Sequence, residues 1–156
     1  MKKLFFIVLF FSLSFCIFAQ EKREKPLSIG IGPEWNMDSR HNFAAGAVMA
    51  FTYNLPYSFA IGIDLSGSSN FSHIHIFEPD LILRYYLFTN DYSGLFIQMD
   101  VGAFLMYEDD DFIPMIQFGF RGGYRFLLGS SFFIEPYGRL GYPFAFGIGL
   151  VGGVRF

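Results

Sequence analysis

Charged residues recur along this sequence at a spacing that would let them form one network of ion pairs. Alternate side chains of a β-strand point to opposite faces, and each of these residues falls on the less apolar parity of an alternating segment. They comprise six acids and five arginines: Glu34, Asp64, Glu78, Asp80, Asp100, Glu135, Arg84, Arg121, Arg125, Arg139 and Arg155. Because an enclosed charge is very costly unless it is paired, this nearly balanced set predicts a packed ionic interior. A gated path for ions or protons is the functional alternative.

Two other groups of residues have side chains that bind metals. His73 and His75 would share one strand face, where two imidazoles and one further ligand can hold a metal ion, but Glu78 and Asp80 lie on the opposite parity. The acidic run 108–111 offers the carboxylate oxygens that hard cations prefer, yet it lacks the glycine and the spacing of a dedicated calcium loop. We therefore predict no metal site and no cofactor, and interpret the run as a solvated loop.

Serine and histidine also occur close together, as a hydrolase would require. A nucleophilic hydroxyl needs an imidazole beside it on the same face. Ser72 and His73 are adjacent in sequence, so they would point to opposite faces of a strand. Ser39 and His41 have a better spacing but fall in a predicted loop. No catalytic residue is therefore predicted.

Eight segments with a period of two would position the charged residues. They span residues 27–35, 43–54, 57–66, 73–88, 94–107, 112–127, 132–141 and 144–156. In the last segment one parity is apolar and carries Phe144, Phe146, Ile148, Leu150, Val154 and Phe156, whereas the other consists of Ala145, Gly147, Gly149, Val151, Gly153 and Arg155. A membrane β-strand needs about 9–11 residues, so these lengths and an even strand count fit a transmembrane barrel. The connections 36–42, 67–72, 108–111 and 141–143 would then lie outside the cell.

The charged parity is predicted to face the inside of the barrel. It carries eleven of the 17 glycines, which suits the narrow lumen of an eight-stranded barrel. Every lysine lies at or before Lys25, so each charged strand position with a positive charge is an arginine. Arginine suits buried, paired charges better than lysine does. An aromatic-rich soluble sandwich is the alternative to this arrangement.

The composition and the N-terminus agree with export. The chain of 156 residues is 53% hydrophobic and 16% charged, yet beyond residue 20 it has no run of roughly 20 apolar residues that could form a spanning helix. Lys2, Lys3, an apolar stretch and Ala19 predict a signal peptide over residues 1–19, followed by a polar segment over 20–26. A retained helical anchor and lipidation of Cys16 are the alternatives. Loss of this leader would leave a net charge of −5, which argues against nucleic acid as a partner.

The leader, the eight alternating segments and the aromatic C-terminus together resemble the small outer-membrane β-barrel proteins of Gram-negative-type bacteria, such as OmpX-like barrels and the membrane domain of OmpA. The resemblance implies an all-β, eight-stranded antiparallel transmembrane up-and-down barrel over residues 27–156, with both termini in the periplasm. It also implies an outer-membrane location, a monomer in contact with outer-membrane lipid, and recognition by the barrel assembly machinery. The residues implicated in that recognition are Ile148, Leu150, Val154 and Phe156, although Gly152 interrupts their apolar spacing.

The same resemblance favours a structural or surface-interaction role, with a lumen plugged by the charged residues. A lipid-modifying enzyme similar to lipid A deacylases is one alternative, although the residue pattern of those enzymes is not matched. A narrow conduit for small solutes is the other alternative. Eight strands leave room for side chains rather than for a wide channel.

Overall fold

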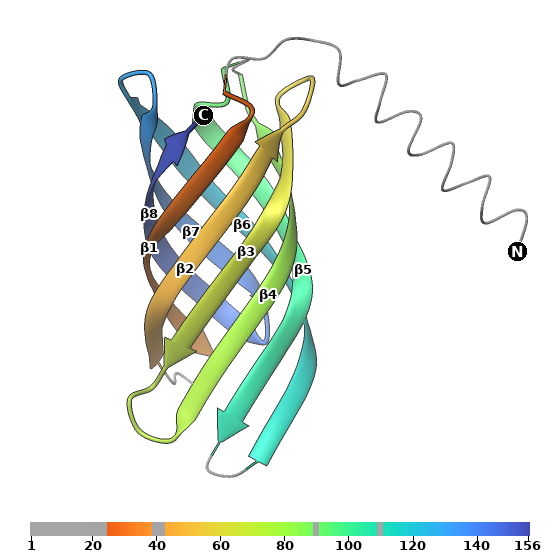
Figure 1. Cartoon of the computed structure of the whole chain (residues 1–156). Helices are drawn as coiled ribbons and strands as arrows, with labels where there is room; N and C mark the ends of the chain where they lie inside the picture. The colour runs from red at the N-terminus through yellow and green to blue at the C-terminus, as the bar shows by residue number, and fades with distance from the viewer. Residues whose placement is uncertain (1–24, 39–42, 89–90, 109–110) are drawn as a thin grey trace, which may run out of the picture.

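Eight β-strands form a closed barrel in the computed structural model of the chain (Figure 1). The structure describes residues 25–38, 43–88, 91–108 and 111–156. The strands are β1 (Leu27–Asp38), β2 (Phe43–Asn54), β3 (Phe59–Ser69), β4 (Ile74–Tyr86), β5 (Gly94–Glu108), β6 (Asp111–Leu128), β7 (Phe132–Tyr142) and β8 (Phe144–Arg155). Each strand pairs antiparallel with its neighbour in sequence, and β8 pairs with β1. The predicted fold class is therefore confirmed.

The barrel has a terminal end, where Leu27 and Phe156 lie, and an outer end, where β1 connects to β2 and β7 to β8. The predicted leader 1–19 and most of the predicted segment 20–26 lie outside the described residues. Within the described ranges no helix has the length and apolar character needed to cross a membrane.

All four predicted outer connections are wrong in part, because strand pairing extends into each of them. Asn36 was expected in a loop, but it pairs with Ala44 on one side and Gly147 on the other, and its side chain is buried. Ser68 likewise belongs to β3 and pairs with Gly46. A neighbouring strand on each side satisfies the backbone groups of these polar segments, and this outweighs their loop-like composition.

The prediction that Phe144 faces outward is also wrong. The β1–β8 register shifts between Met37, which pairs with Phe146, and Asp38, which pairs with Phe144. This bulge leaves Ala145 as an extra residue and moves Phe144 to the inner face. There Phe144 is 5% exposed and its ring meets Phe104 edge-on at 5.3 Å between centroids.

Four prolines lie within strands, and each occupies a position that is paired on one side only. Pro33 pairs with Ala47 but has no partner in the β8 ladder, and Pro136 pairs with Leu150 but has none in the β6 ladder. Pro79 lacks a partner in the β5 ladder, and Pro114 lies where β6 runs beyond β7. Proline has no N–H to donate to a ladder, so these gaps are where its presence costs least.

Candidate functional site

The charged residues singled out by the sequence line the inside of the barrel. Ten of the eleven have at most 5% of their surface exposed: Glu34, Asp64, Glu78, Asp80, Arg84, Asp100, Arg121, Arg125, Glu135 and Arg139. The eleventh, Arg155, is partly exposed at the terminal end and donates to the carbonyl of Asp91 at 2.9 Å. We call the ten buried side chains the lumenal network. Its ion pairs fall into three layers along the barrel axis.

The terminal layer is built around Glu135 of β7. Its Oε1 accepts from Arg84 Nη1 at 2.7 Å and also from Arg125 Nε. Both guanidinium groups lie over aromatic rings, Arg84 over Phe96 at 4.1 Å and Arg125 over Phe133 at 4.2 Å. A single carboxylate therefore offsets only part of the positive charge of the two arginines, and the cation–π contacts stabilise both guanidinium groups.

The middle layer is built around Arg121 of β6. Its Nη1 donates to Asp64 Oδ2 at 2.7 Å, and its Nε lies 3.7 Å from Asp100 Oδ2. The amide of Gln98 bridges the two aspartates, because its Nε2 donates to Asp64 at 3.3 Å and also to Asp100. The guanidinium lies over the ring of Tyr137 at 4.4 Å.

The outer layer is built around Arg139 of β7, which joins two glutamates. Its Nη1 donates to Glu34 Oε1 and its Nη2 to Glu78 Oε2, both at 2.9 Å. Ser66 donates to Glu78 at 3.2 Å, and Asn36 donates to Glu34 at 2.8 Å. Ser66 thus satisfies the Glu78 oxygen that the arginine does not reach, whereas Asn36 shares Glu34 Oε1 with the arginine.

The three layers are joined into one network by two residues. Gln98 accepts from Arg84 Nε at 2.7 Å and so links the terminal layer to the middle one. Glu34 lies 4.0 Å from Arg121 and accepts from Tyr137, which links the middle layer to the outer one. Charges drawn from six strands therefore form a single buried cluster.

The neutral partners were missed by sequence reasoning. Gln98 and Gln117 share the parity of the charged residues, and that parity was the one signal that could have found them. Tyr137 shares it too, but nothing local in the sequence predicts that its hydroxyl would donate to Glu34. Such partners come from strands far apart in the chain.

Glycines on β8 make room for the network, as the alternating pattern of that strand suggests. A Cβ atom at Gly149 would overlap the phenol of Tyr137. A Cβ atom at Gly147 would lie 2.8 Å from Arg139 Cγ. Both side chains take part in holding Glu34, so the small face of β8 is a packing requirement of the network.

Two clusters of apolar side chains fill the lumen around the network. The terminal plug consists of Val48, Ala60, Tyr86, Phe96, Phe133, Tyr137 and Val151, with Tyr92 and Leu127 against it. The outer plug consists of Ala44, Ile76, Phe104 and Phe144, with Ile74, Met106 and Met115 against it. The first of these clusters interleaves with the charged layers, because Phe96, Phe133 and Tyr137 lie against the arginines. The charges are thus surrounded by apolar side chains, which keeps the local dielectric low and makes an unpaired charge costly.

The other candidate groups do not come together. His73 and His75 are both exposed at the outer end, and His75 lies in β4 opposite Ser69 and Tyr107. In the acidic run, Glu108 ends β5 and Asp111 begins β6, whereas residues 109 and 110 lie outside the described ranges, as do Ser39 and His41. Among the described residues, no three His, Cys, Asp or Glu side chains are arranged to hold a metal ion.

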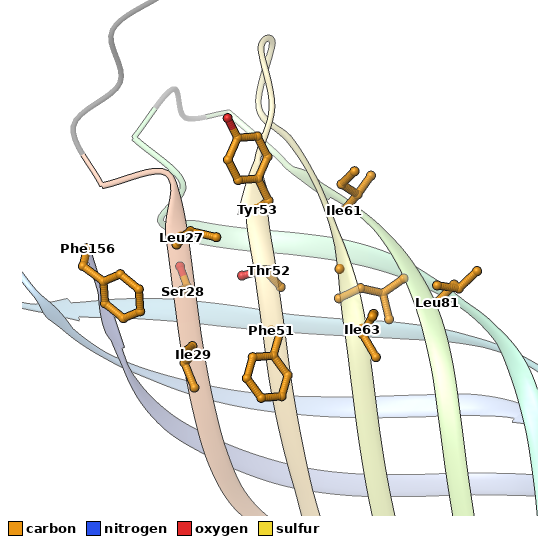
Figure 2. A pocket seen from close by; sticks show the side chains of 12 residues that line it. Leu27, Ser28, Ile29, Phe51, Thr52, Tyr53, Ile61, Ile63, Leu81 and Phe156 are labelled. Atoms are coloured by element: carbon orange, nitrogen blue, oxygen red, sulfur yellow. The ribbon is translucent and has the colours of Figure 1, made fainter. Parts of the chain in front are cut away.

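A shallow apolar depression of about 710 Å³ lies on the outside of the barrel at the terminal end (Figure 2). The rings of Phe51 and Phe156 and the side chain of Leu81 line it, across β1 to β4. Phe156 is anchored there by backbone hydrogen bonds with Leu27 of 3.0 and 3.1 Å. Of the residues implicated in assembly, Ile148, Leu150 and Phe156 are between 44 and 51% exposed.

Comparison with known proteins identifies the fold. No family model and no curated protein matches the chain. Among solved structures it is similar to the N-terminal β-barrel domain of Pseudomonas aeruginosa OprF, with 15% identity, a TM-score of 0.60, and coverage of 85% of this chain and 100% of that one. Neisserial surface protein A is 13% identical, with a TM-score of 0.58 and coverage of 83% and 94%.

A third similar structure is Ail, the attachment invasion locus protein of Yersinia pestis, with 13% identity, a TM-score of 0.55, and coverage of 86% of this chain and 100% of that one. At these identities the likeness concerns the fold alone. It is the fold that the sequence pattern predicted, a small transmembrane β-barrel.

Proposed function

We propose that this chain is an integral protein of the bacterial outer membrane with a structural or surface-interaction role and a plugged lumen. The observation that carries the proposal is the inverted distribution of its side chains. Carboxylates and guanidiniums are buried inside, while large apolar residues are exposed on all eight strands, among them Ile31, Phe51, Ile63, Leu81, Ile97, Phe120, Leu140 and Ile148. A soluble monomer rarely exposes a contiguous apolar patch larger than a few hundred Å². A protein surface in contact with the acyl chains of lipids, by contrast, has to be apolar.

The proposed surface role rests on the hairpin of β5 and β6. These strands have 15 and 18 residues, longer than any other in the barrel. The β6–β7 ladder starts only at the pair Phe118 and Tyr142, so residues 111–117 of β6 pair with β5 alone. The hairpin thus extends beyond β7 at the outer end (Figure 1). This extension carries two exposed acids, Glu108 and Asp111, and two exposed aromatic residues, Tyr107 and Phe112.

Leu81→Arg tests whether the outside of the barrel wall is in contact with lipid. Leu81 lies near the middle of β4 and is 68% exposed. An arginine at the middle of a lipid-facing surface should lower the free energy of unfolding by about 2–4 kcal/mol. The measurement is denaturant unfolding of the barrel in lipid vesicles, followed by tryptophan fluorescence of Trp35.

Phe112→Arg is the matched control, because Phe112 is also exposed but lies at the tip of the β5–β6 hairpin. Near an interface the cost should fall to about 0–1 kcal/mol. Equal and small effects of both substitutions would show that the outer surface is hydrated, and the proposal of a membrane location would be abandoned.

Planar-bilayer recording separates the plugged barrel from the conduit. Because ion-paired side chains and two apolar plugs fill the lumen, we expect no stepwise conductance from the reconstituted protein. Steady single-channel steps that disappear when Arg121 is replaced would support the conduit instead.

A further inference from the structure

One carboxylate of the lumenal network has no ion-pair partner. Glu34, Glu78, Asp64, Asp100 and Glu135 each lie within 4.0 Å of an arginine nitrogen. Asp80 is the exception among the six inward-facing acids of the described strands. The buried network holds six acids and four arginines, so its acids are in excess, and Asp80 is the acid with which none of these arginines forms an ion pair.

The surroundings of Asp80 offer one hydrogen bond where an ionised carboxylate would need several. Its side chain is 3% exposed, and its Oδ2 accepts from Gln117 Nε2 at 2.8 Å. Its Oδ1 is buried without a hydrogen-bond partner in the protein. This oxygen lies against Gly102, where an added Cβ atom would overlap it. A buried, singly hydrogen-bonded carboxylate is strongly disfavoured in its charged form.

The side chain of Gln117, which is hydrogen-bonded to Asp80, also has an oxygen that lacks a donor. Its side chain is completely buried, and its Oε1 also has no hydrogen-bond partner in the protein. Two unsatisfied acceptors, Asp80 Oδ1 and Gln117 Oε1, therefore belong to the same pair of side chains that already share the Oδ2–Nε2 hydrogen bond. A proton on Oδ1 would donate to Oε1 and close a ring of two hydrogen bonds between acid and amide.

The charges around Asp80 also favour the protonated, neutral form of its carboxyl group. Its cross-strand partner on β3 is Asp64. Glu78 on β4 and Asp100 on β5 repel its charge, and Arg139 on β7 and Arg121 on β6 attract it from beyond ion-pair distance. Both arginines already bind other carboxylates, at 2.7 to 2.9 Å.

We propose that Asp80 and Gln117 form a proton-binding site inside the barrel, in which Asp80 carries a proton on Oδ1 in the folded protein at neutral pH. The bound proton makes Asp80 a neutral donor to Gln117 Oε1 and reduces the excess negative charge of the lumenal network. The site concerns the interior alone, so it stands independently of the membrane location proposed above.

Asp80→Asn tests the site, because asparagine reproduces the neutral acid: its Nδ2 can donate to Gln117 Oε1 and its Oδ1 can accept from Nε2. In infrared spectra of the full folded protein labelled with ¹³C-aspartate at pH 7, the wild type should show the C=O stretch of a protonated carboxylic acid. The variant should lack this band. Thermal unfolding of the wild type should shift to lower temperature as the pH rises and the proton leaves, whereas unfolding of the variant should be far less dependent on pH.

Asp100→Asn is the matched control, since Asp100 is equally buried but lies next to Arg121. It should keep the acid band and lower the unfolding temperature at every pH. If Asp80→Asn does not fold, Gln117→Leu serves instead: it should keep the band but move it to higher frequency, because the carbonyl oxygen Oδ2 loses the hydrogen bond from Nε2 and the acid proton loses Oε1 as its acceptor.

Two results would overturn the proposal. One is a wild-type spectrum at pH 7 without a protonated acid band. The other is stabilisation of the wild type by NaCl over choline chloride at equal ionic strength that Asp80→Asn abolishes, because a bound cation would then occupy the place assigned to the proton.

Discussion

Glu135→Leu is expected to lower the free energy of unfolding by about 3–5 kcal/mol, because removing one partner of a buried ion pair leaves an uncompensated charge. Here a single carboxylate serves Arg84 and Arg125, so the substitution leaves two guanidiniums unpaired in the same layer. Arg84 would retain Gln98 and Tyr86 as hydrogen-bond partners, and Arg125 would retain Ser28. None of these neutral groups replaces the lost negative charge. Denaturant unfolding in lipid vesicles measures the effect.

Glu108→Leu is the matched control, because it makes the same chemical change at an exposed position on the outer end of β5. It should leave the unfolding transition nearly unchanged. The triple variant Arg84→Met, Arg125→Met, Glu135→Leu should recover much of the lost stability, since apolar residues of similar volume often replace a buried ionic cluster without loss. If the Glu135→Leu protein were as stable as the wild type, water would have to solvate the two arginines of the terminal layer. The lumen would then not be plugged at the terminal end.

The fold was largely readable from the sequence because a β-barrel strand carries its two environments in alternation. A side chain such as Asp64 or Arg121 needs only its own segment to reveal that it lies on the less apolar face. The parity of the charged positions thus placed ten of them inside a closed barrel before any pairing was known. Local periodicity is sufficient where the side-chain environment changes with every residue.

Features that depend on neighbouring strands were not readable in this way. Phe144 turns inward because of a bulge in the β1–β8 ladder, and Asn36 lies in a strand because Ala44 and Gly147 flank it. The extension of β6 beyond β7 depends on where β7 ends. A bulge or a ladder end is a property of two strands, so one segment alone carries little sign of it.

The ion-pair partners within the network could not be predicted from the sequence either. Arg84 and Glu135 are 51 residues apart, and Arg139 and Glu34 are 105 apart. Which arginine meets which acid follows from the relative register of several strands, and a shift by one residue would turn every side chain to the other face. The sequence showed that acids outnumber arginines on the inner parity by one, but only the structure identifies Asp80 as the unpaired acid.

Arg121→Met is the second substitution expected to have a large effect, with a loss of about 3–5 kcal/mol in the free energy of unfolding. Arg121 faces three carboxylates, at 2.7 Å from Asp64, 3.7 Å from Asp100 and 4.0 Å from Glu34. Without it, Asp64 and Asp100 share only the amide of Gln98 as a close donor. Arg121→Lys should be intermediate, because an ammonium keeps the charge but cannot span several carboxylates as the guanidinium fork does.

A double-mutant cycle decides whether this loss comes from the ion pair. If the pair with Asp64 dominates, Arg121→Met combined with Asp64→Asn should cost clearly less than the sum of the two single substitutions. Arg155→Met is the control, since Arg155 is partly exposed and donates to a backbone carbonyl, so its removal should have a much smaller effect. Strict additivity of Arg121→Met and Asp64→Asn would mean that the two side chains are not coupled, and the middle layer would then be a hydrated lumen rather than a packed network.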